Sequence, residues 1–241
     1  MMTLIVPIAA NNAEYAHKLP KPFRQDDEGT MLCVKAITGL PMDVIQDIYF
    51  VILKEHDERF MLKEQLEMQF RKYRLANAHV TILDEPTASQ VETVARAIEL
   101  NGVTGLVFIK DADCYFTTDE ILPQNGVAIY PLENLPIVDP QHKSYVAVDD
   151  MFYVTNIIEK RVVSHFFSAG GYCFEDATEF CRYYLDNPDF MNAINLRVFD
   201  TVYSRLGSTT KGSSSTSVPL PYTQGGLNTL AAEQPSTKQN N

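Results

Sequence analysis

The first 110 residues alternate between short apolar runs and longer segments of mixed polarity. Four runs are almost continuously apolar, as expected of strands buried on both faces: Leu4–Ala10, Ile48–Leu53, Val80–Leu83 and Gly105–Ile109. Three segments between them are predicted as helices: Met31–Leu40, Glu55–Leu75 and Gln90–Leu100. This alternation predicts an α/β fold with a mainly parallel twisted sheet and helices on both faces.

The second half of the chain has a different pattern, with short strands separated by turns. The predicted strands are Val127–Tyr130, Tyr145–Val148, Thr155–Glu159 and Gly171–Phe174. Two helices are predicted to follow, Asp176–Leu185 and Pro188–Leu206, because proline fits the first position of a helix. From residue 207 onward Ser, Thr, Gly, Pro, Gln and Asn dominate without an apolar period. This composition predicts one domain over residues 1–206 and a disordered tail over residues 207–241.

Charge and composition exclude several classes of function. The net charge of −11 argues against a nucleic-acid-binding surface. The four cysteines form no CxxC pair and the five histidines lack metal-ligand spacing, so neither a disulfide framework nor a zinc site is indicated. No apolar stretch approaches the roughly 20 residues of a membrane span, and a cytoplasmic location is expected. A small anion would need a local cationic patch, which Lys18, Lys21 and Arg24 provide.

Polar residues follow the apolar runs where the predicted strands end. Because ligands bind outside the carboxyl ends of parallel strands, these residues should face one crevice: Asn11, Asn12, Asp84–Thr87, Asp111 and Asp113. Asp111 and Asp113 lie two residues apart and therefore on one side of an extended chain, where carboxylates are suitable Mg²⁺ ligands. Aspartate also terminates strands as an ordinary turn residue, and the residues alone leave both interpretations open.

Five segments in order carry a resemblance to a known family. They read LIVPIAANNAEY (4–15), PKPF (20–23), DEPTASQVETVARAI (84–98), VFIKDADCYF (107–116) and IIEKRVVSHFFSAGGYCF (157–174). This order and spacing resembles the nucleotidyltransferases that join a nucleoside triphosphate to a sugar 1-phosphate or to phosphocholine. The likeness is close to the branch found in capsule and surface-polysaccharide gene sets. It covers residues 4–206 and not the tail.

The resemblance implies a nucleotide-diphospho-sugar transferase-like fold, a Rossmann-like three-layer sandwich. It implies Mg²⁺-dependent nucleotidyl transfer from a nucleoside triphosphate to a phosphorylated small molecule, with release of pyrophosphate. The implied metal ligands are Asp113 and Asp200, and the implied catalytic phosphate contacts are Lys21 and Lys160. The nucleotide would be bound by Ala10, Asn11, Asn12, Pro86, Thr87, Gln90 and Asp111. The acceptor would be bound by Glu159, Ser168 and Gly170.

The opening loop departs from the family pattern. Ala10 and Asn12 stand where the family has glycines, which let backbone amides approach phosphates closely. Glu14 stands where the family has an arginine, and a reversed charge beside a phosphate should cost several kcal/mol of transition-state stabilisation. Three explanations are open. Lys18 or Arg24 replaces that arginine, or the domain binds a nucleotide sugar or another phosphorylated ligand without transferring a nucleotidyl group, or the chain is a catalytically degenerate relative that acts as a binding or interaction protein.

A further alternative is a glycosyltransferase that uses a nucleotide sugar. The stretch Asp111-Ala112-Asp113 matches the DxD pattern with which such enzymes of a related sheet architecture hold a metal. The Pro-Lys-Pro and Glu-Lys segments do not belong to that pattern. The sequence therefore favours an enzyme of the nucleotidyltransferase type and leaves both alternatives open.

Overall fold

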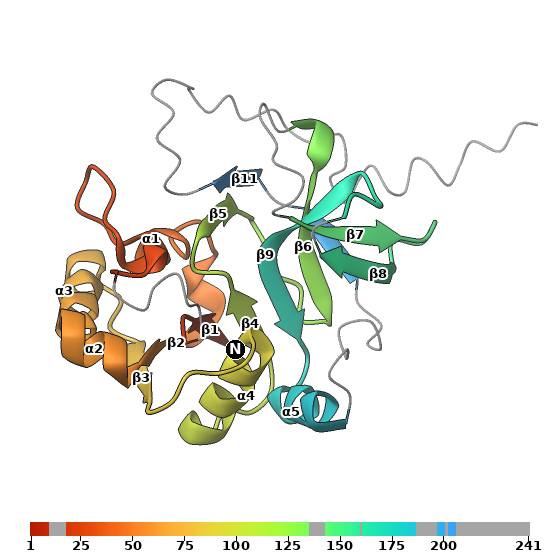
Figure 1. Cartoon of the computed structure of the whole chain (residues 1–241). Coiled ribbons are helices and arrows are strands. Elements are labelled where there is room, and N and C mark those ends of the chain that lie inside the picture. The colour runs from red at the N-terminus through yellow and green to blue at the C-terminus, as the bar shows by residue number, and fades with distance from the viewer. Residues whose placement is uncertain (10–17, 135–142, 160, 187–196, 201, 206–241) are drawn as a thin grey trace, which may run out of the picture. The chain divides into compact units, whose positions relative to one another are not determined.

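The computed structural model describes residues 1–9, 18–134, 143–159, 161–186, 197–200 and 202–205 (Figure 1). Its helices are α1 (Leu32–Lys35), α2 (Lys54–Phe60), α3 (Leu62–Tyr73), α4 (Gln90–Asn101) and α5 (Ala177–Asp186). The strands of the first half are β1 (Met2–Pro7), β2 (Ile45–Leu53), β3 (Ala78–Leu83), β4 (Val107–Lys110) and β5 (Cys114–Thr117). The later strands are β6 (Gly126–Pro131), β7 (Ser144–Val148), β8 (Val154–Glu159), β9 (Phe166–Phe174), β10 (Arg197–Asp200) and β11 (Val202–Arg205). The predicted tail, residues 207–241, lies outside the described residues.

Nine of the described strands form one mixed, mostly parallel sheet. The main order is β10-β6-β9-β4-β1-β2-β3, and β7 pairs with both β8 and β9. Strands β1 to β4, β6, β7 and β10 run in one direction, whereas β8 and β9 run in the other. The expected α/β sheet with flanking helices is confirmed. The antiparallel β9 between β4 and β6 joins the parallel half to the second half of the chain.

Alternating residues of β1 explain why this strand reads as a continuous apolar run. Leu4 and Val6 contribute to one buried cluster together with residues of α1 and α3. Ile5 contributes to a second cluster together with residues of α4 and α5. Since successive side chains of a strand point to opposite faces, a sheet covered by helices on both faces needs apolar residues at every position.

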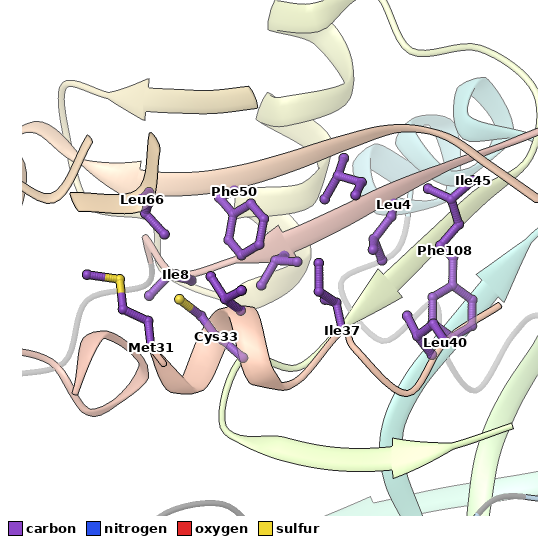
Figure 2. Close-up of a cluster of buried hydrophobic side chains, with 14 of the residues drawn as sticks. Leu4, Ile8, Met31, Cys33, Ile37, Leu40, Ile45, Phe50, Leu66 and Phe108 are labelled. Carbon is purple, nitrogen blue, oxygen red and sulfur yellow. The ribbon is translucent and has the colours of Figure 1, made fainter. Parts of the chain in front are cut away.

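The first of these clusters lies between the sheet and the segment Met31–Leu40 (Figure 2). Figure 2 shows Leu4 and Phe50 of the sheet facing Cys33 and Ile37 of that segment. All four side chains are fully buried. This packing fixes the chain that leads into the segment from Lys21, and so places one of the predicted site residues.

Two predicted helices are shorter or interrupted in the structure. The segment Met31–Leu40 forms the helix α1 only over Leu32–Lys35, and the residues that follow make turns, in keeping with the low helix propensity of Thr38 and Gly39. The segment Glu55–Leu75 is divided into α2 and α3 at Met61, which has a left-handed backbone (φ 53°). A methionine gives no sequence signal for such a break.

The predicted helix Pro188–Leu206 is wrong. Its described part consists of two strands: β10 (Arg197–Asp200), parallel to β6, and β11 (Val202–Arg205), antiparallel to β5. Valine, phenylalanine and tyrosine in this stretch have high strand propensity. Backbone pairing with β6 and β5 favours the extended conformation over the predicted helix. Strand β5 itself was not predicted. No helix in the described part of the chain is long and apolar enough to cross a membrane.

Candidate functional site

The carboxyl end of β4 leads into a tight turn that carries both predicted aspartates. Asp111 and Asp113 lie between β4 and β5, and the Asp111 N–H donates to the carbonyl of Gly170 on β9 (2.9 Å). This is the edge of the sheet at which β1, β2 and β3 also end, since they run parallel to β4. The turn therefore occupies the position at which α/β sheets bind ligands.

Lys21 reaches the same turn from a distant part of the sequence. It opens a short 3₁₀ turn, Lys21–Phe23, which is anchored by the buried Phe23 ring. Lys21 Nζ lies 3.1 Å from Asp113 Oδ2, with 23% and 54% of the two side chains exposed. A pair this exposed contributes little stability, about 0–1 kcal/mol. Its significance is that a cation and a carboxylate 92 residues apart meet at an accessible point.

Gln90 and Asp111 form the second contact of the site. Gln90 is the first residue of α4, where the Ser89 hydroxyl caps the helix by accepting from the Glu92 N–H (3.1 Å). Gln90 Nε2 donates to Asp111 Oδ1 at 2.5 Å. Burial raises the pKa of Asp111, and the neighbouring Lys110 charge and the Gln90 hydrogen bond oppose that rise. The side chain of Asp111 is thus held in place, while that of Asp113 faces solvent.

Gly170 lets β9 approach the aspartate turn. Its backbone is left-handed (φ 81°), and a Cβ at this position would lie 2.6 Å from Asp111 Oδ2 and in collision with Cys114 Sγ. The Ser168 hydroxyl accepts from the Gly170 N–H (3.2 Å) and donates to Tyr172 Oη (2.9 Å). Of the two residues predicted to contact the acceptor, Gly170 therefore lies against the turn of Asp111, and Ser168 is joined to it through the Gly170 N–H.

Thr87, predicted to contact the nucleotide, has a structural role in the described residues. It is buried, and both its N–H and its hydroxyl donate to the carbonyl of Ala9 (3.1 and 3.2 Å). Its hydroxyl also lies 2.5 Å from the Thr93 hydroxyl. These bonds fasten the loop before α4 to the end of β1. Pro86, beside it, is exposed.

Several predicted site residues are not placed by the structure. Ala10, Asn11, Asn12 and Lys160 lie outside the described residues, as does Glu14. Glu159 ends β8 and Asp200 ends β10, where Asp200 pairs with Ile129 of β6 along the backbone. Lys18 and Arg24 are exposed on either side of the Lys21–Phe23 turn.

Two lysines near the site were not identified from the sequence. Lys110 is fully buried directly before Asp111. Lys143 lies just before β7 with its Nζ 4.6 Å from the centre of the Phe167 ring, and its charge helps to lower the pKa of Asp111 against the effect of burial. Strand pairing of β7 with β9 brings Lys143 here, and this pairing has no local sequence signal.

Asp111 and Asp113 are the carboxylates that the described part of the site offers to a metal ion. No group of three or more His, Cys, Asp or Glu side chains in the described ranges is arranged to hold a metal ion. Asp111 and Asp113 are adjacent at the strand end, and Asp113 is open to a further ligand. Burial raises the pKa of the neighbouring Cys114 thiol to about 11, so this cysteine is a protonated, packed residue and not a thiolate ligand.

Comparison by sequence finds no matching family model and no matching curated protein. Comparison by structure finds a nucleoside-diphosphate-sugar pyrophosphorylase from Vibrio cholerae RC9, with a TM-score of 0.62 and 14% identity over 83% of this chain and 91% of that one. The inositol-1-phosphate CTP transferase from T. maritima aligns with a TM-score of 0.66 and 12% identity, over 88% and 91%. HddC from Yersinia pseudotuberculosis, complexed with GMP-PN, aligns with a TM-score of 0.58 and 13% identity, over 85% and 92%. At these identities the likeness establishes the nucleotidyltransferase fold and nothing finer.

Proposed function

We propose that this chain transfers a nucleotidyl group from a nucleoside triphosphate to a phosphorylated small molecule, such as a sugar 1-phosphate, and releases pyrophosphate. The observation that carries the proposal is the meeting of Lys21 and Asp113, 3.1 Å apart, at the carboxyl edge of the sheet. It occurs in a fold shared with a nucleoside-diphosphate-sugar pyrophosphorylase and an inositol-1-phosphate CTP transferase. A phosphate-binding cation beside a metal-binding carboxylate is what phosphoryl chemistry requires.

Lys21 has the role of a phosphate contact in this proposal. The reaction is an in-line attack of an acceptor phosphate oxygen on the α-phosphorus, and negative charge accumulates on the leaving pyrophosphate. Lys21 exchanges its Asp113 partner for a phosphate oxygen and neutralises part of that charge. Because an ion pair that is partly open to solvent is worth only about 0–1 kcal/mol, breaking it for this exchange costs little.

Asp113 and Asp111 suit Mg²⁺ as donors. Mg²⁺ is usually held by one or two carboxylates together with substrate phosphates and water, so a pair of aspartates is sufficient. Asp113 supplies an accessible carboxylate, and Asp111 supplies one whose orientation Gln90 fixes. Bound there, the ion would neutralise the phosphates and orient the nucleotide. Asp200 remains our proposed additional ligand from β10.

The acceptor side of the site is proposed to lie along β9. Gly170 is beside Asp111, Ser168 accepts from the Gly170 N–H, and Lys143 is close enough for its charge to act on Asp111. Lys143 adds positive charge that a phosphorylated acceptor requires in a chain of net charge −11. Glu159, the last residue of β8, and Lys160, which follows it in the sequence, are proposed to complete this side.

The test is pyrophosphate release from each ribonucleoside triphosphate and deoxythymidine triphosphate, with a panel of sugar 1-phosphates, with and without Mg²⁺. One nucleotide and acceptor pair should release pyrophosphate only with the metal. Asp113→Asn and Lys21→Met should each lower kcat/KM by about 100-fold to 1000-fold. Glu179→Gln is the matched control, because Glu179 belongs to an exposed ion pair of the same length (3.1 Å, with Arg182) on α5.

The second candidate is a degenerate relative that binds a nucleotide without transferring it. The observation in its favour is Glu14 at the position of the family arginine. Binding of a nucleotide that is lost in Asp113→Asn, with no pyrophosphate released from any pair, would establish this candidate and refute ours. Transfer of a sugar from a nucleotide sugar would instead support the DxD alternative. That alternative fits less well, because Lys21, which belongs to the Pro-Lys-Pro segment and not to the DxD pattern, meets Asp113 in the structure.

A further inference from the structure

Lys110 is a buried lysine at the edge of the site. Its side chain has no solvent exposure, although it is the last residue of β4 and directly precedes the aspartate turn. Lys110 Nζ donates to the carbonyl of Asp111 (3.0 Å), to the carbonyl of Cys114 (2.9 Å) and to Cys114 Sγ (3.0 Å). The ammonium group also lies 4.7 Å from the centre of the Phe116 ring.

These contacts match the capacity of an ammonium group one for one. A lysine has three N–H donors and no acceptor, and each of the three contacts supplies one acceptor. Burial of a charged group without such partners is strongly unfavourable, so a lysine remains here only because the turn satisfies it. An apolar residue of the same length would fill the space but leave two carbonyl groups of the turn without this donor.

The acceptors lie at both ends of the turn. Asp111 begins it and Cys114 ends it, so the ammonium group closes the turn from its buried side. β9 holds the same two residues from the other direction: the Asp111 N–H donates to Gly170 O (2.9 Å) and Cys114 Sγ donates to Ala169 O (3.0 Å). Asp113 is thereby displayed on a turn that is fixed at both ends.

We propose that Lys110 is a positioning residue, which holds the Asp111–Cys114 turn in the conformation that presents Asp113 and Asp111 to a metal-bound nucleotide. The inference rests on the proposed function for its ligand and on the three contacts of Lys110 for its geometry. Lys110 touches no substrate and acts through the two carboxylates. A metal site whose carboxylates are already held in the binding orientation binds the ion more tightly. Loss of a group that holds them typically weakens metal binding about 10-fold to 100-fold.

Two measurements on purified full-length protein test this proposal. The first is amide hydrogen exchange over residues 111–114, which reports local opening of the turn without any ligand. The second is the Mg²⁺ concentration that half-saturates nucleotide binding, measured with the triphosphate that gives the largest Mg²⁺-dependent thermal shift. Both are made on wild type, Lys110→Met and Leu66→Ala. Leu66 is fully buried in α3 away from the turn, so its substitution controls for loss of stability alone.

In Lys110→Met we expect exchange over residues 111–114 to be about tenfold faster and the half-saturating Mg²⁺ concentration to rise about tenfold or more. Nucleotide binding without Mg²⁺ should not change. Leu66→Ala should lower the melting temperature without either effect. An unchanged Mg²⁺ requirement in Lys110→Met, or an equal rise in Leu66→Ala, would overturn the proposal.

The test also applies if Lys110→Met does not fold or if the wild type binds no nucleotide. If Lys110→Met does not fold, Cys114→Ala replaces it, because this change keeps the ammonium group and removes only the Sγ contacts with Lys110 Nζ and with the carbonyls of Asp111 and Ala169. A raised Mg²⁺ requirement in Cys114→Ala supports the proposal and an unchanged one refutes it. If wild type binds no nucleotide at all, the proposed function fails, and hydrogen exchange alone then decides whether Lys110 fixes the turn.

Discussion

Replacement of Gly170 by alanine tests the close approach of β9 to the aspartate turn. Two separate penalties apply at this position. The left-handed backbone (φ 81°) costs a residue with a Cβ about 1–2 kcal/mol. The new Cβ would also lie 2.6 Å from Asp111 Oδ2 and 2.8 Å from Asp111 Cβ, and such overpacking typically costs about 1–3 kcal/mol. Gly170→Ala should therefore lower the free energy of unfolding by about 2–5 kcal/mol.

Gly102 provides a matched control for the backbone penalty. It also has a left-handed backbone (φ 62°), at the end of α4, but no atom lies within 4 Å of the position its Cβ would take. Gly102→Ala should therefore cost only the backbone penalty, about 1–2 kcal/mol. The difference between the two variants, about 1–3 kcal/mol, measures the collision of the new Cβ with the Cys114 and Asp111 side chains.

Urea unfolding followed by far-ultraviolet circular dichroism gives both free energies, provided that the slope against urea stays unchanged. In thermal unfolding, each kcal/mol corresponds to about 2–4 °C for a domain of this size. Gly170→Ala should also raise the Mg²⁺ requirement for nucleotide binding, because Asp111 must move. Equal stability losses in Gly170→Ala and Gly102→Ala would refute the packing described for this turn.

Substitutions at three further positions test the support of the site and the charge of the loop that contains Asp26. Thr87→Val removes a buried hydroxyl with two hydrogen bonds, and urea unfolding should show a loss of about 1–3 kcal/mol. Ser89→Ala removes the cap of α4 and should cost about 1 kcal/mol, whereas Ser89→Asp should retain most of it. At Asp26 burial raises the pKa, but hydrogen bonds from the Thr30 N–H and Lys35 outweigh burial and lower the pKa below its ordinary 3.8. The ionised Asp26 carboxylate therefore stabilises the fold fully at pH values above its pKa in the unfolded chain. This stabilisation is lost as the pH falls through its lower pKa in the folded chain. The decline of the melting temperature at acid pH should therefore be shallower in Asp26→Asn.

The parts of the fold that could be predicted are those in which burial on both faces leaves a continuous apolar run. Leu4–Ala10 is such a run, and its strand is confirmed over Met2–Pro7. Pro188–Leu206 was predicted wrongly, because its mixture of apolar and polar residues fits a helix period as well as a strand period. Its pairing with β6 and β5 decides the outcome, and partners so distant in sequence leave no local signal. The left-handed break at Met61 also lacks a local signal, because methionine is not a residue that favours this backbone conformation.

For the site, the sequence identified candidate residues at strand ends, but it did not predict which of their side chains contact one another. Lys21 and Asp113 were both selected, and the structure brings them together. Gln90 was selected as a nucleotide contact, whereas in the structure it donates to Asp111, and its contact with a nucleotide remains a prediction. Lys110 was overlooked, because a lysine at the end of an apolar strand is ordinarily a surface residue. Only the three-dimensional turn shows that this ammonium group is enclosed.

The position of β9 has a consequence for synthesis of the chain. Its pairing partner β4 is complete at Lys110, but Val107 pairs with Phe174, 67 residues later. At about 5–20 residues per second, a ribosome needs about 3–13 s to produce the residues in between. During that interval β4, whose four residues are all buried in the finished sheet, has one edge without its partner. The ribosome thus completes the residues from Lys21 to Asp113 several seconds before β9 is available to pair with β4. A nascent chain that stalls in that interval exposes the edge of an apolar strand to neighbouring chains.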